Sequence, residues 1–295
     1  MASVIDTTAI CKTFTASHSK RSVVPALSNV SFTLHTGEFL VVLGPSGAGK
    51  TTLARIVMSH LTPTSGRILR FGMDTVPREW EAWTGYVPES GTMSARATGR
   101  RVLAAAGQVP AKTTAELSYA VDSMLDAFGL ASLADTPSWT YSRGVAARLS
   151  VACALIHRPR LVVLDNPTQS LDHTGRILLK RALEHLRMQG ASVLLTSCEI
   201  TDVESCADTI LVLRHGNIAN RGKLCEVLSP ETAFTVKVSR DPLLAPGWQF
   251  VRNGEGWYSL VSGRSQLDLL LRALTCRGIT PSAVAPVPCA TTSLF

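Results

Sequence analysis

The chain has 295 residues, 45% of them hydrophobic, and a formal net charge of +7. This length suffices for one large or two unequal domains, and no uncharged apolar run approaches the roughly 20 residues that a membrane-spanning helix needs. The N-terminal sequence MASVIDTTAICKTF has neither the basic segment nor the long apolar core of a secretory signal. Seven scattered cysteines, never spaced as CxxC, argue against a disulfide framework or zinc site and for a reducing, cytosolic compartment.

The first half of the chain alternates strand and helix signals. Residues Val23–Leu34 partly alternate apolar and polar side chains, and Phe39–Leu43 (FLVVL) is typical of a short buried strand. Residues Leu53–Met58 continue as a helix, and the turn-rich segment LTPTSGRILRFG leads into another short strand. Residues 91–158 have mainly helical periodicity.

Strand signals return at Leu161–Leu164, Val193–Leu195 and Thr209–Leu213, with a helix expected from His173 to Met188. Parallel strands that alternate with helices predict an α/β nucleotide domain, here residues 1–230, with an inserted helical subdomain at 91–158. After the break at SPETA, residues 231–295 have a strand signal (FTVKV), a hairpin signal around NGEG, a helix signal (QLDLLLRALTCRG) and a Pro-rich tail ending in ATTSLF. We expect a small α+β appendix there, too small to be a second catalytic domain.

A phosphate-binding loop follows the strand at Phe39–Leu43 and precedes a helix. Its glycines let successive backbone N–H groups face one anion, and the helix N-terminus adds a favourable dipole. Lys50 supplies a charge for the β- and γ-phosphates, and the Thr51 hydroxyl can bind Mg²⁺. The expected nucleotide-binding residues of the loop GPSGAGKTT are Gly44, Pro45, Ser46, Gly47, Ala48, Gly49, Lys50, Thr51 and Thr52.

A second motif, LVVLDNPT at Leu161–Thr168, supplies only some of the groups that hydrolysis of a bound nucleotide needs. Asp165 directly follows the expected strand Leu161–Leu164 and supplies a carboxylate for a metal ion. Asn166 follows it, and an amide does not act as a general base at neutral pH. The sequence therefore predicts binding of a nucleotide with Mg²⁺ but leaves its hydrolysis in question.

The order of these motifs resembles that of an ATP-binding-cassette (ABC) transporter ATPase subunit, over residues 1 to about 230. On that resemblance Phe14 stacks on adenine, and Glu89, in TGYVPES, takes the place of the glutamine that senses Mg²⁺ and the membrane partner. The Glu89 carboxylate either joins Thr51 and Asp165 in binding Mg²⁺ or repels the nucleotide. Asn166 takes the place of the catalytic glutamate, and Cys198 that of the histidine near the γ-phosphate. Ser170, Leu171 and Asp172 match the interface loop that follows.

The resemblance implies that ATP with Mg²⁺ lies between two subunits, so a second ATPase subunit, identical or different, and a transmembrane transporter subunit are expected partners. The signature segment is YSRGV here, which keeps Ser142 and Gly144 for the partner's phosphates but has Arg143 in place of a glycine. Arg143 must either point away or pair with a phosphate. The appendix is similar to that of type 2 ABC exporters, and we expect a cytoplasmic subunit held at the inner face of the membrane by its partner.

Because Asn166 and Cys198 replace the catalytic glutamate and histidine that the resemblance implies, we expect little ATP hydrolysis by the isolated chain. The alternative is that these substitutions are ordinary sequence drift and leave catalysis near normal. Two other functions stay open: a non-hydrolysing, ATP-gated regulatory subunit, and a soluble ABC protein acting on nucleic acid. Such soluble proteins carry two cassettes or a long coiled-coil insertion, which are absent from this sequence. No aromatic-interleaved basic stripe is present either, so no nucleic-acid partner is expected.

Overall fold

The structure, a computed structural model, describes residues 2–15, 23–89, 96–108, 113–199, 207–223, 227, 233–239, 250–253, 256–275 and 279–286. The chain divides into two compact units, Met1–Arg221 and Gly222–Phe295. The expected domain boundary near residue 230 and the ATTSLF ending lie outside the described residues and stay predictions. Within the described part of the chain, no helix combines the length and apolar character needed to cross a bilayer.

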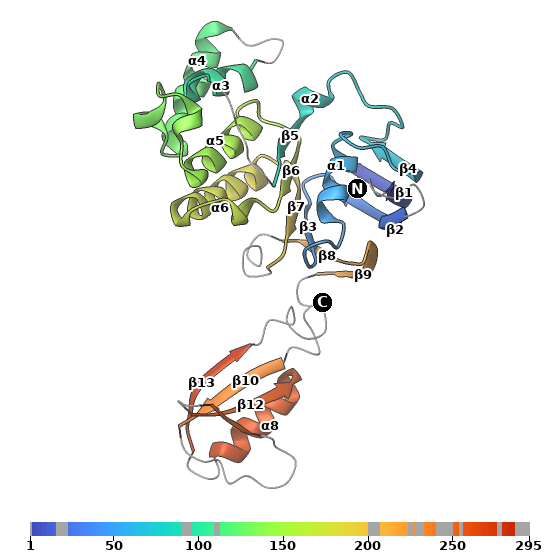
Figure 1. Cartoon of the computed structure of the whole chain (residues 1–295), viewed down its shortest axis with the longest axis vertical. Helices are drawn as coiled ribbons and strands as arrows, with labels where there is room; N and C mark the ends of the chain where they lie inside the picture. The colour runs from blue at the N-terminus through green and yellow to red at the C-terminus, as the bar shows by residue number, and fades with distance from the viewer. Residues whose placement is uncertain are drawn as a thin grey trace. The chain divides into compact units, whose positions relative to one another are not determined.

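A six-stranded sheet of order β5-β6-β7-β3-β8-β9 forms the centre of the larger unit (Figure 1). The strands from β5 to β8 in this order pair in parallel. Every residue of β3, β6 and β7 is buried, as expected for apolar strands covered on both faces. The strands are β3 (Phe39–Leu43), β5 (Thr84–Val87), β6 (Leu161–Asp165), β7 (Ser192–Ser197), β8 (Thr209–Arg214) and β9 (Asn217–Gly222).

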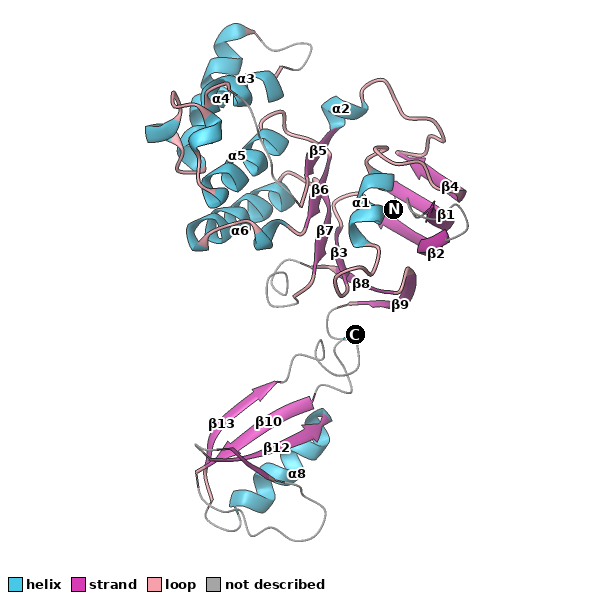
Figure 2. Ribbon diagram, in the orientation of Figure 1, coloured by secondary structure: helices cyan, strands magenta, loops and turns pink. Residues whose placement is uncertain are grey.

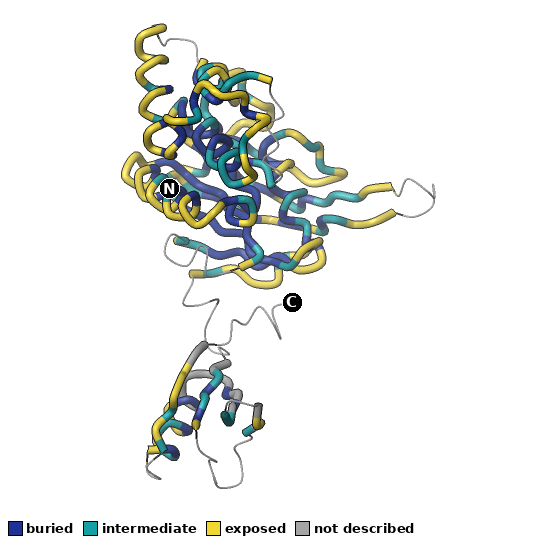
Figure 3. Tube along the Cα trace, turned by 60° about the vertical axis from the view of Figure 1, so that its left-hand side comes forward, coloured by how far each residue is buried: buried dark blue, intermediate teal, exposed yellow. Residues whose placement is uncertain are grey.

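Helices cover both faces of this sheet, and burial is concentrated in the strands between them (Figure 3). Helix α1 (Lys50–Val57) joins strands β6 and β7 in one apolar core, while α5 (Arg143–Leu155) and α6 (His173–Met188) lie on the other side (Figure 1). The predicted α/β fold is confirmed, and β3 and α6 have the bounds that the sequence indicated.

A three-stranded antiparallel sheet of order β2-β1-β4 packs beside α1. It consists of β1 (Ser3–Thr15), β2 (Val23–His35) and β4 (Ser65–Arg70). Strand β1 was not predicted from the sequence. Its register against β2 shifts between Thr7 and Ile10, and Ala9 between them has a φ of 51°. Such an irregularity breaks the alternation by which a strand is recognised.

The inserted segment after β5 is helical, as expected. Helix α3 begins after the cap residue Thr98, and α4 begins with a capping box formed by Thr113 and Glu116. Apolar side chains of these helices and of the segment that follows are buried: Leu103, Val121, Leu125, Phe128 and Leu130. The helices described in this region are α3 (Gly99–Ala106), α4 (Thr114–Ala127), and the short 3₁₀ turns η1 (Ala131–Leu133) and η2 (Ser138–Thr140), whereas the short helix α2 (Trp80–Trp83) precedes β5.

The smaller unit is an antiparallel sheet of order β11-β12-β10-β13 with one helix. Val236, Val261, Leu270 and Leu274 form its core, which joins the sheet to the helix. The expected strand, hairpin and helix signals are all found here. Its elements are β10 (Ala233–Val238), β11 (Val251–Asn253), β12 (Gly256–Ser262), α8 (Gly263–Thr275) and β13 (Pro281–Pro286).

Candidate nucleotide site

Three neighbouring parallel strands end at one edge of the large sheet, and the predicted site residues follow their ends (Figure 2). Strand β7 lies between β3 and β6, and its register pairs Thr196 with Asp165 and Ser197 with Leu43. The loop after β3, the carboxylate at the end of β6 and Cys198 after β7 therefore meet at the carboxyl edge, where ligands bind in open α/β sheets.

The loop between β3 and α1 needs its glycines for close backbone approach. A Cβ atom on Gly44 would lie 2.3 Å from the Leu213 carbonyl oxygen, and one on Gly49 would lie 2.4 Å from that of Ala26. Gly49 also has a φ of 105°, which other residues rarely adopt. Ala48 closes the turn, its N–H donating to the Pro45 carbonyl at 3.1 Å.

The loop encloses a hollow of about 270 Å³. Because α1 starts at Lys50, its first backbone N–H groups have no partner within the helix and can face an anion. The hollow brings together most of the predicted phosphate-binding residues with two others singled out in the sequence. Its lining residues are Ala26, Ser46, Gly47, Gly49, Lys50, Thr51, Thr52, Glu89 and Cys198.

Lys50 is buried at the base of this hollow. Its ammonium donates to the carbonyl oxygens of Gly44 at 2.7 Å and Pro45 at 2.8 Å, and lies 3.3 Å from the Cys198 Sγ. The thiol at the position where the sequence resemblance implied a histidine is therefore in direct contact with the loop lysine. A thiol is a weaker hydrogen-bond donor than an imidazole, so this position offers a γ-phosphate less than a histidine would.

Thr51 and Asp165 form the predicted metal position. The Thr51 Oγ1 donates to the Asp165 Oδ1 at 3.2 Å, and the Thr196 Oγ1 donates to the same oxygen at 2.7 Å. Burial raises the pKa of Asp165, and the hydrogen bonds from Thr196 and Thr51 oppose that rise. Its Oδ2 is buried and has no donor among the described residues. An unsatisfied carboxylate oxygen beside a hydroxyl fits Mg²⁺, which prefers oxygen ligands and completes its shell with water and phosphate.

Glu89 and Asn166 lie side by side at the same edge. The Asn166 Nδ2 donates to the Glu89 Oε1 at 3.0 Å and to the Gln169 Oε1 at 3.0 Å, so both amide hydrogens have acceptors. The other Glu89 oxygen, Oε2, lies 3.3 Å from the Thr51 Oγ1, so the single hydrogen of that hydroxyl is shared between the Glu89 and Asp165 carboxylates. Asn166 has a left-handed backbone, with φ 48° and ψ 49°. Asparagine tolerates this conformation better than most residues.

The signature segment connects to the same site through Ser170. Ser142 caps α5, accepting from the Val145 N–H at 3.4 Å, and a Cβ atom on Gly144 would lie 3.0 Å from the Asp172 side chain. The Arg143 guanidinium donates to the Ser170 Oγ at 3.3 Å. That hydroxyl in turn donates to the Glu89 carbonyl oxygen at 3.2 Å. The Arg143 side chain was expected either to point away or to pair with a phosphate, and in this structure it contacts Ser170 of its own chain.

Phe14 lies apart from these groups, on β1. Its side chain is 42% exposed, and the Lys12 ammonium is 5.3 Å from the ring centroid. Phe14 does not line the hollow formed by the loop. An exposed aromatic face is available for stacking, so its predicted contact with a base stays a prediction.

Sequence reasoning missed two parts of the site. Thr196 lies just beyond the expected strand Val193–Leu195 and was assigned no role, although its hydroxyl donates to the Asp165 carboxylate and accepts, at 2.9 Å, from the Asn166 backbone N–H. A polar residue inside the otherwise apolar run SVLLTS is the signal that could have found it. The contact between Glu89 and Asn166 joins residues 77 positions apart, and nothing local in the sequence indicates that pairing.

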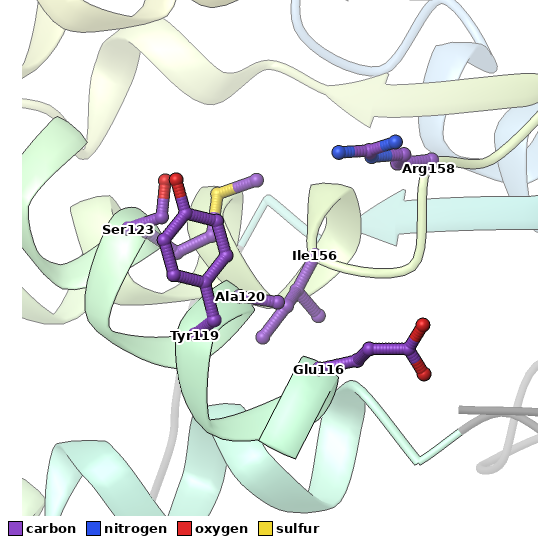
Figure 4. Close-up of a pocket in the computed structure, with 7 residues that line it drawn as sticks. Glu116, Tyr119, Ala120, Ser123, Ile156 and Arg158 are labelled. Atoms are coloured by element: carbon purple, nitrogen blue, oxygen red, sulfur yellow. The ribbon is translucent and has the colours of Figure 1, made fainter. Parts of the chain in front are cut away.

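A second hollow, of about 280 Å³, lies on the helical part of the unit (Figure 4). Tyr119 and Glu116 of α4 stand on one side, and Ile156 and Arg158, which follow α5, on the other (Figure 4). Tyr119 is 78% exposed. The phosphate-loop residues do not line this hollow, so it is a surface feature separate from the nucleotide site.

Comparison with known proteins gives the family. The family described as ABC transporter matches residues 27–169. The chain is 36% identical over 200 residues to the Nod factor export ATP-binding protein I of Sinorhizobium fredii, covering 67% of this chain and 58% of that protein. It is 30% identical over 209 residues to the ABC transporter ATP-binding protein NatA of Bacillus subtilis, covering 70% of this chain and 85% of that protein.

A solved dimeric bacterial ABC transporter cassette has the same fold, with a TM-score of 0.68 at 23% sequence identity, over 75% of this chain and 98% of that one. A second structure of that cassette, bound to ADP and Pi, has a TM-score of 0.66 with the same identity and coverage. The chain belongs to the ABC transporter family and has the fold of its ATP-binding cassette.

Proposed function

We propose that this chain is the ATP-binding subunit of a membrane ABC exporter. It binds Mg-ATP at the interface of a cassette dimer to drive or gate transport, and it hydrolyses ATP only weakly. The observation that carries this proposal is the complete phosphate loop, whose hollow lies beside the Thr51–Asp165 pair at one sheet edge. Export is supported by the Nod factor export protein among its relatives.

In this function the chain's own residues bind and orient the nucleotide. Loop N–H groups and the Lys50 ammonium hold the phosphates, and Phe14 stacks on the base. Thr51 and Asp165 hold Mg²⁺, with Glu89 next to them, and the ion supplies positive charge at the phosphate oxygens. Ser142 and Gly144 face the nucleotide of the second cassette, which is either another copy of this chain or a different subunit.

Weak hydrolysis follows from two substitutions at the γ-phosphate side. Asn166 is not a base, and losing a general base costs about 10²–10⁴ in rate. Cys198 contacts Lys50 at 3.3 Å, where an imidazole would be a better donor. Binding depends on neither side chain, so we expect ATP affinity to be normal while turnover is low.

The membrane partner would hold the chain at the cytoplasmic face of the membrane. The exposed Tyr119, beside the hollow in Figure 4, supports docking there, because tyrosine with an apolar body and polar tip is enriched at protein interfaces. Co-purification of tagged chain from native membranes tests this. We expect a transmembrane subunit to be retained by the wild type and reduced about tenfold by Tyr119→Ala, with unchanged Mg-ATP affinity.

A second candidate function is favoured by Asn166 alone: a regulatory subunit that binds ATP and never hydrolyses it. The purified complex distinguishes the two. Phosphate release that is lost when this chain carries Lys50→Ala supports the first function, provided that the same variant of any second cassette is tested in parallel. A tight ATP complex with no phosphate release from this chain's site supports the second. Failure to bind Mg-ATP would contradict both.

A further inference from the structure

A third hollow, of about 650 Å³, lies at the edge of the large sheet opposite the nucleotide site. It is lined by the segments that lead into β6 and β7 and by residues from the antiparallel sheet side of the unit. Because β6 and β7 run in parallel, their first residues lie roughly 15 Å from the ends that carry the nucleotide residues. The volume is within the range of small-molecule sites, about 300–1,000 Å³.

This third hollow is positively charged. Of the described residues that line it, Arg158 and Arg160 are cationic and none carries a carboxylate. Both arginines are exposed, and no ion pair among the described residues involves either of them. The guanidinium group presents a planar fork of N–H donors that matches the oxygens of phosphate. The charge of the lining therefore complements an anionic ligand.

Helix capping does not account for these two arginines. Helix α6 ends beside the hollow, where a cation can satisfy the last carbonyl oxygens of a helix. The carbonyl oxygens of His185, Leu186 and Arg187 already accept from backbone N–H groups of the next turn. In the described part of the chain, neither arginine donates a side-chain hydrogen bond. Arg158 also has a φ of 56°, which asparagine tolerates better than arginine, so the backbone does not favour arginine there.

Another part of the lining is apolar and held in place. The Arg160 guanidinium lies 5.1 Å from the centroid of the Trp83 ring, a cation–π contact that orients it. Trp83 meets Phe71 edge-on at 5.4 Å, and Phe71 lines the hollow together with Val4. The Ser192 N–H donates to the Arg160 carbonyl oxygen at 2.9 Å, which ties this segment to the start of β7. Cationic and apolar groups are thus arranged around one hollow before any ligand binds.

We propose that this hollow binds a phosphate ester that carries an apolar group. Arg158 and Arg160 hold the phosphate, which has enough oxygen atoms to accept from both guanidinium groups. The apolar group lies against Phe71 and Val4, where its burial adds to the affinity. The headgroup of an anionic lipid and a soluble organic phosphate share this chemistry. The site lies at the other edge of the sheet from the phosphate loop and does not depend on ATP binding.

The test titrates the full chain with phenyl phosphate, and with inorganic phosphate as the probe that lacks an apolar group. R158N/R160Q removes both charges, with asparagine chosen because it tolerates the left-handed backbone at this position. R78N/R181Q removes the same charge from two exposed positions that do not line the hollow. Because the phosphate loop also attracts phosphate, K50A is titrated in parallel. Thermal melting verifies that each variant is folded.

We expect phenyl phosphate to bind R158N/R160Q at least about tenfold more weakly than the wild type, because hydrogen bonds to charged groups are strong. K50A and R78N/R181Q should keep the wild-type Kd within about threefold, since neither changes a group that holds this phosphate. Inorganic phosphate should bind at least about tenfold more weakly than phenyl phosphate. An unchanged Kd in R158N/R160Q would overturn the proposal, as would binding that K50A abolishes or equal affinity for the two probes.

Sedimentation with vesicles distinguishes the two sources of the phosphate. Vesicles of phosphatidylcholine are compared with vesicles that also contain phosphatidylglycerol. Sedimentation with the phosphatidylglycerol vesicles that R158N/R160Q loses and R78N/R181Q keeps supports a lipid headgroup as the ligand. Binding of phenyl phosphate without such sedimentation supports a soluble phosphate ester. Sedimentation that both double variants lose equally reflects the net charge of the chain and would overturn a lipid site in this hollow.

Discussion

The phosphate loop and the residues opposite it meet at one hollow, but different physical requirements determine which residues can stand on each side. On the loop side, Gly44 and Gly49 are fixed by backbone approach, since an added Cβ would lie within 2.4 Å of a carbonyl oxygen in each case. On the opposite side, Asn166 and Cys198 stand where the sequence resemblance implied a glutamate and a histidine, and Asn166 contacts Glu89 while Cys198 contacts Lys50. In the proposed function, ATP binding depends on backbone geometry and one lysine, whereas ATP hydrolysis depends on the chemistry of a few side chains. The two functions can therefore change separately.

The largest expected effect is on the loop side, where Lys50→Ala removes a buried charge from the phosphates. We expect the Kd for Mg-ATP to rise about 10²-fold, equivalent to about 2.7 kcal/mol, because hydrogen bonds between charged groups are the strong ones. Isothermal titration calorimetry measures this directly. Lys180→Ala, an exposed lysine on α6, is the matched control. An unchanged Kd for Lys50→Ala would mean that the backbone amides alone hold the nucleotide.

The sequence predicted the loop side well and the opposite side only in part. Phe39–Leu43, the loop and the start of α1 are contiguous, so local pattern was enough to identify them. Asp165 could be placed because it ends a strand. The contacts of Glu89 with Asn166 and Thr51, and of Thr196 with Asp165, join residues that are distant in sequence. They depend on strand order and register, which no local pattern specifies.

A smaller effect is expected on the rate at which Cys198 is alkylated, because bound nucleotide would cover this side chain in the hollow beside Lys50. Cys198 lines the hollow, so saturating Mg-ATP should slow its alkylation by maleimide at least about tenfold, because thiols react when accessible as thiolates. Cys153 is the internal control. Burial raises the pKa of its thiol to about 12, so at pH 8 only about one thiol in 10⁴ is ionised.

Peptide mass spectrometry assigns the label to each cysteine. Raising the pH from 7 to 9 should leave Cys153 almost unlabelled, because its pKa of about 12 lies above that whole range. Labelling of Cys198 that is equally fast with and without Mg-ATP would contradict the placement of the nucleotide beside Lys50. Labelling at Cys153 that outpaces Cys198 would contradict the raised pKa of the Cys153 thiol.

The smallest expected effect is on the stability of variants at position 166, where the effect of an added charge can be distinguished from the effect of backbone strain. Asn166 has a φ of 48°, and glutamate tolerates this left-handed conformation less well than asparagine or aspartate, by about 1 kcal/mol. N166E and N166D both place a second carboxylate near Glu89, so repulsion is common to them. Chemical denaturation should therefore show N166E about 1 kcal/mol less stable than N166D. Equal stability would mean that the backbone there relaxes, and glutamate could then occupy the position freely.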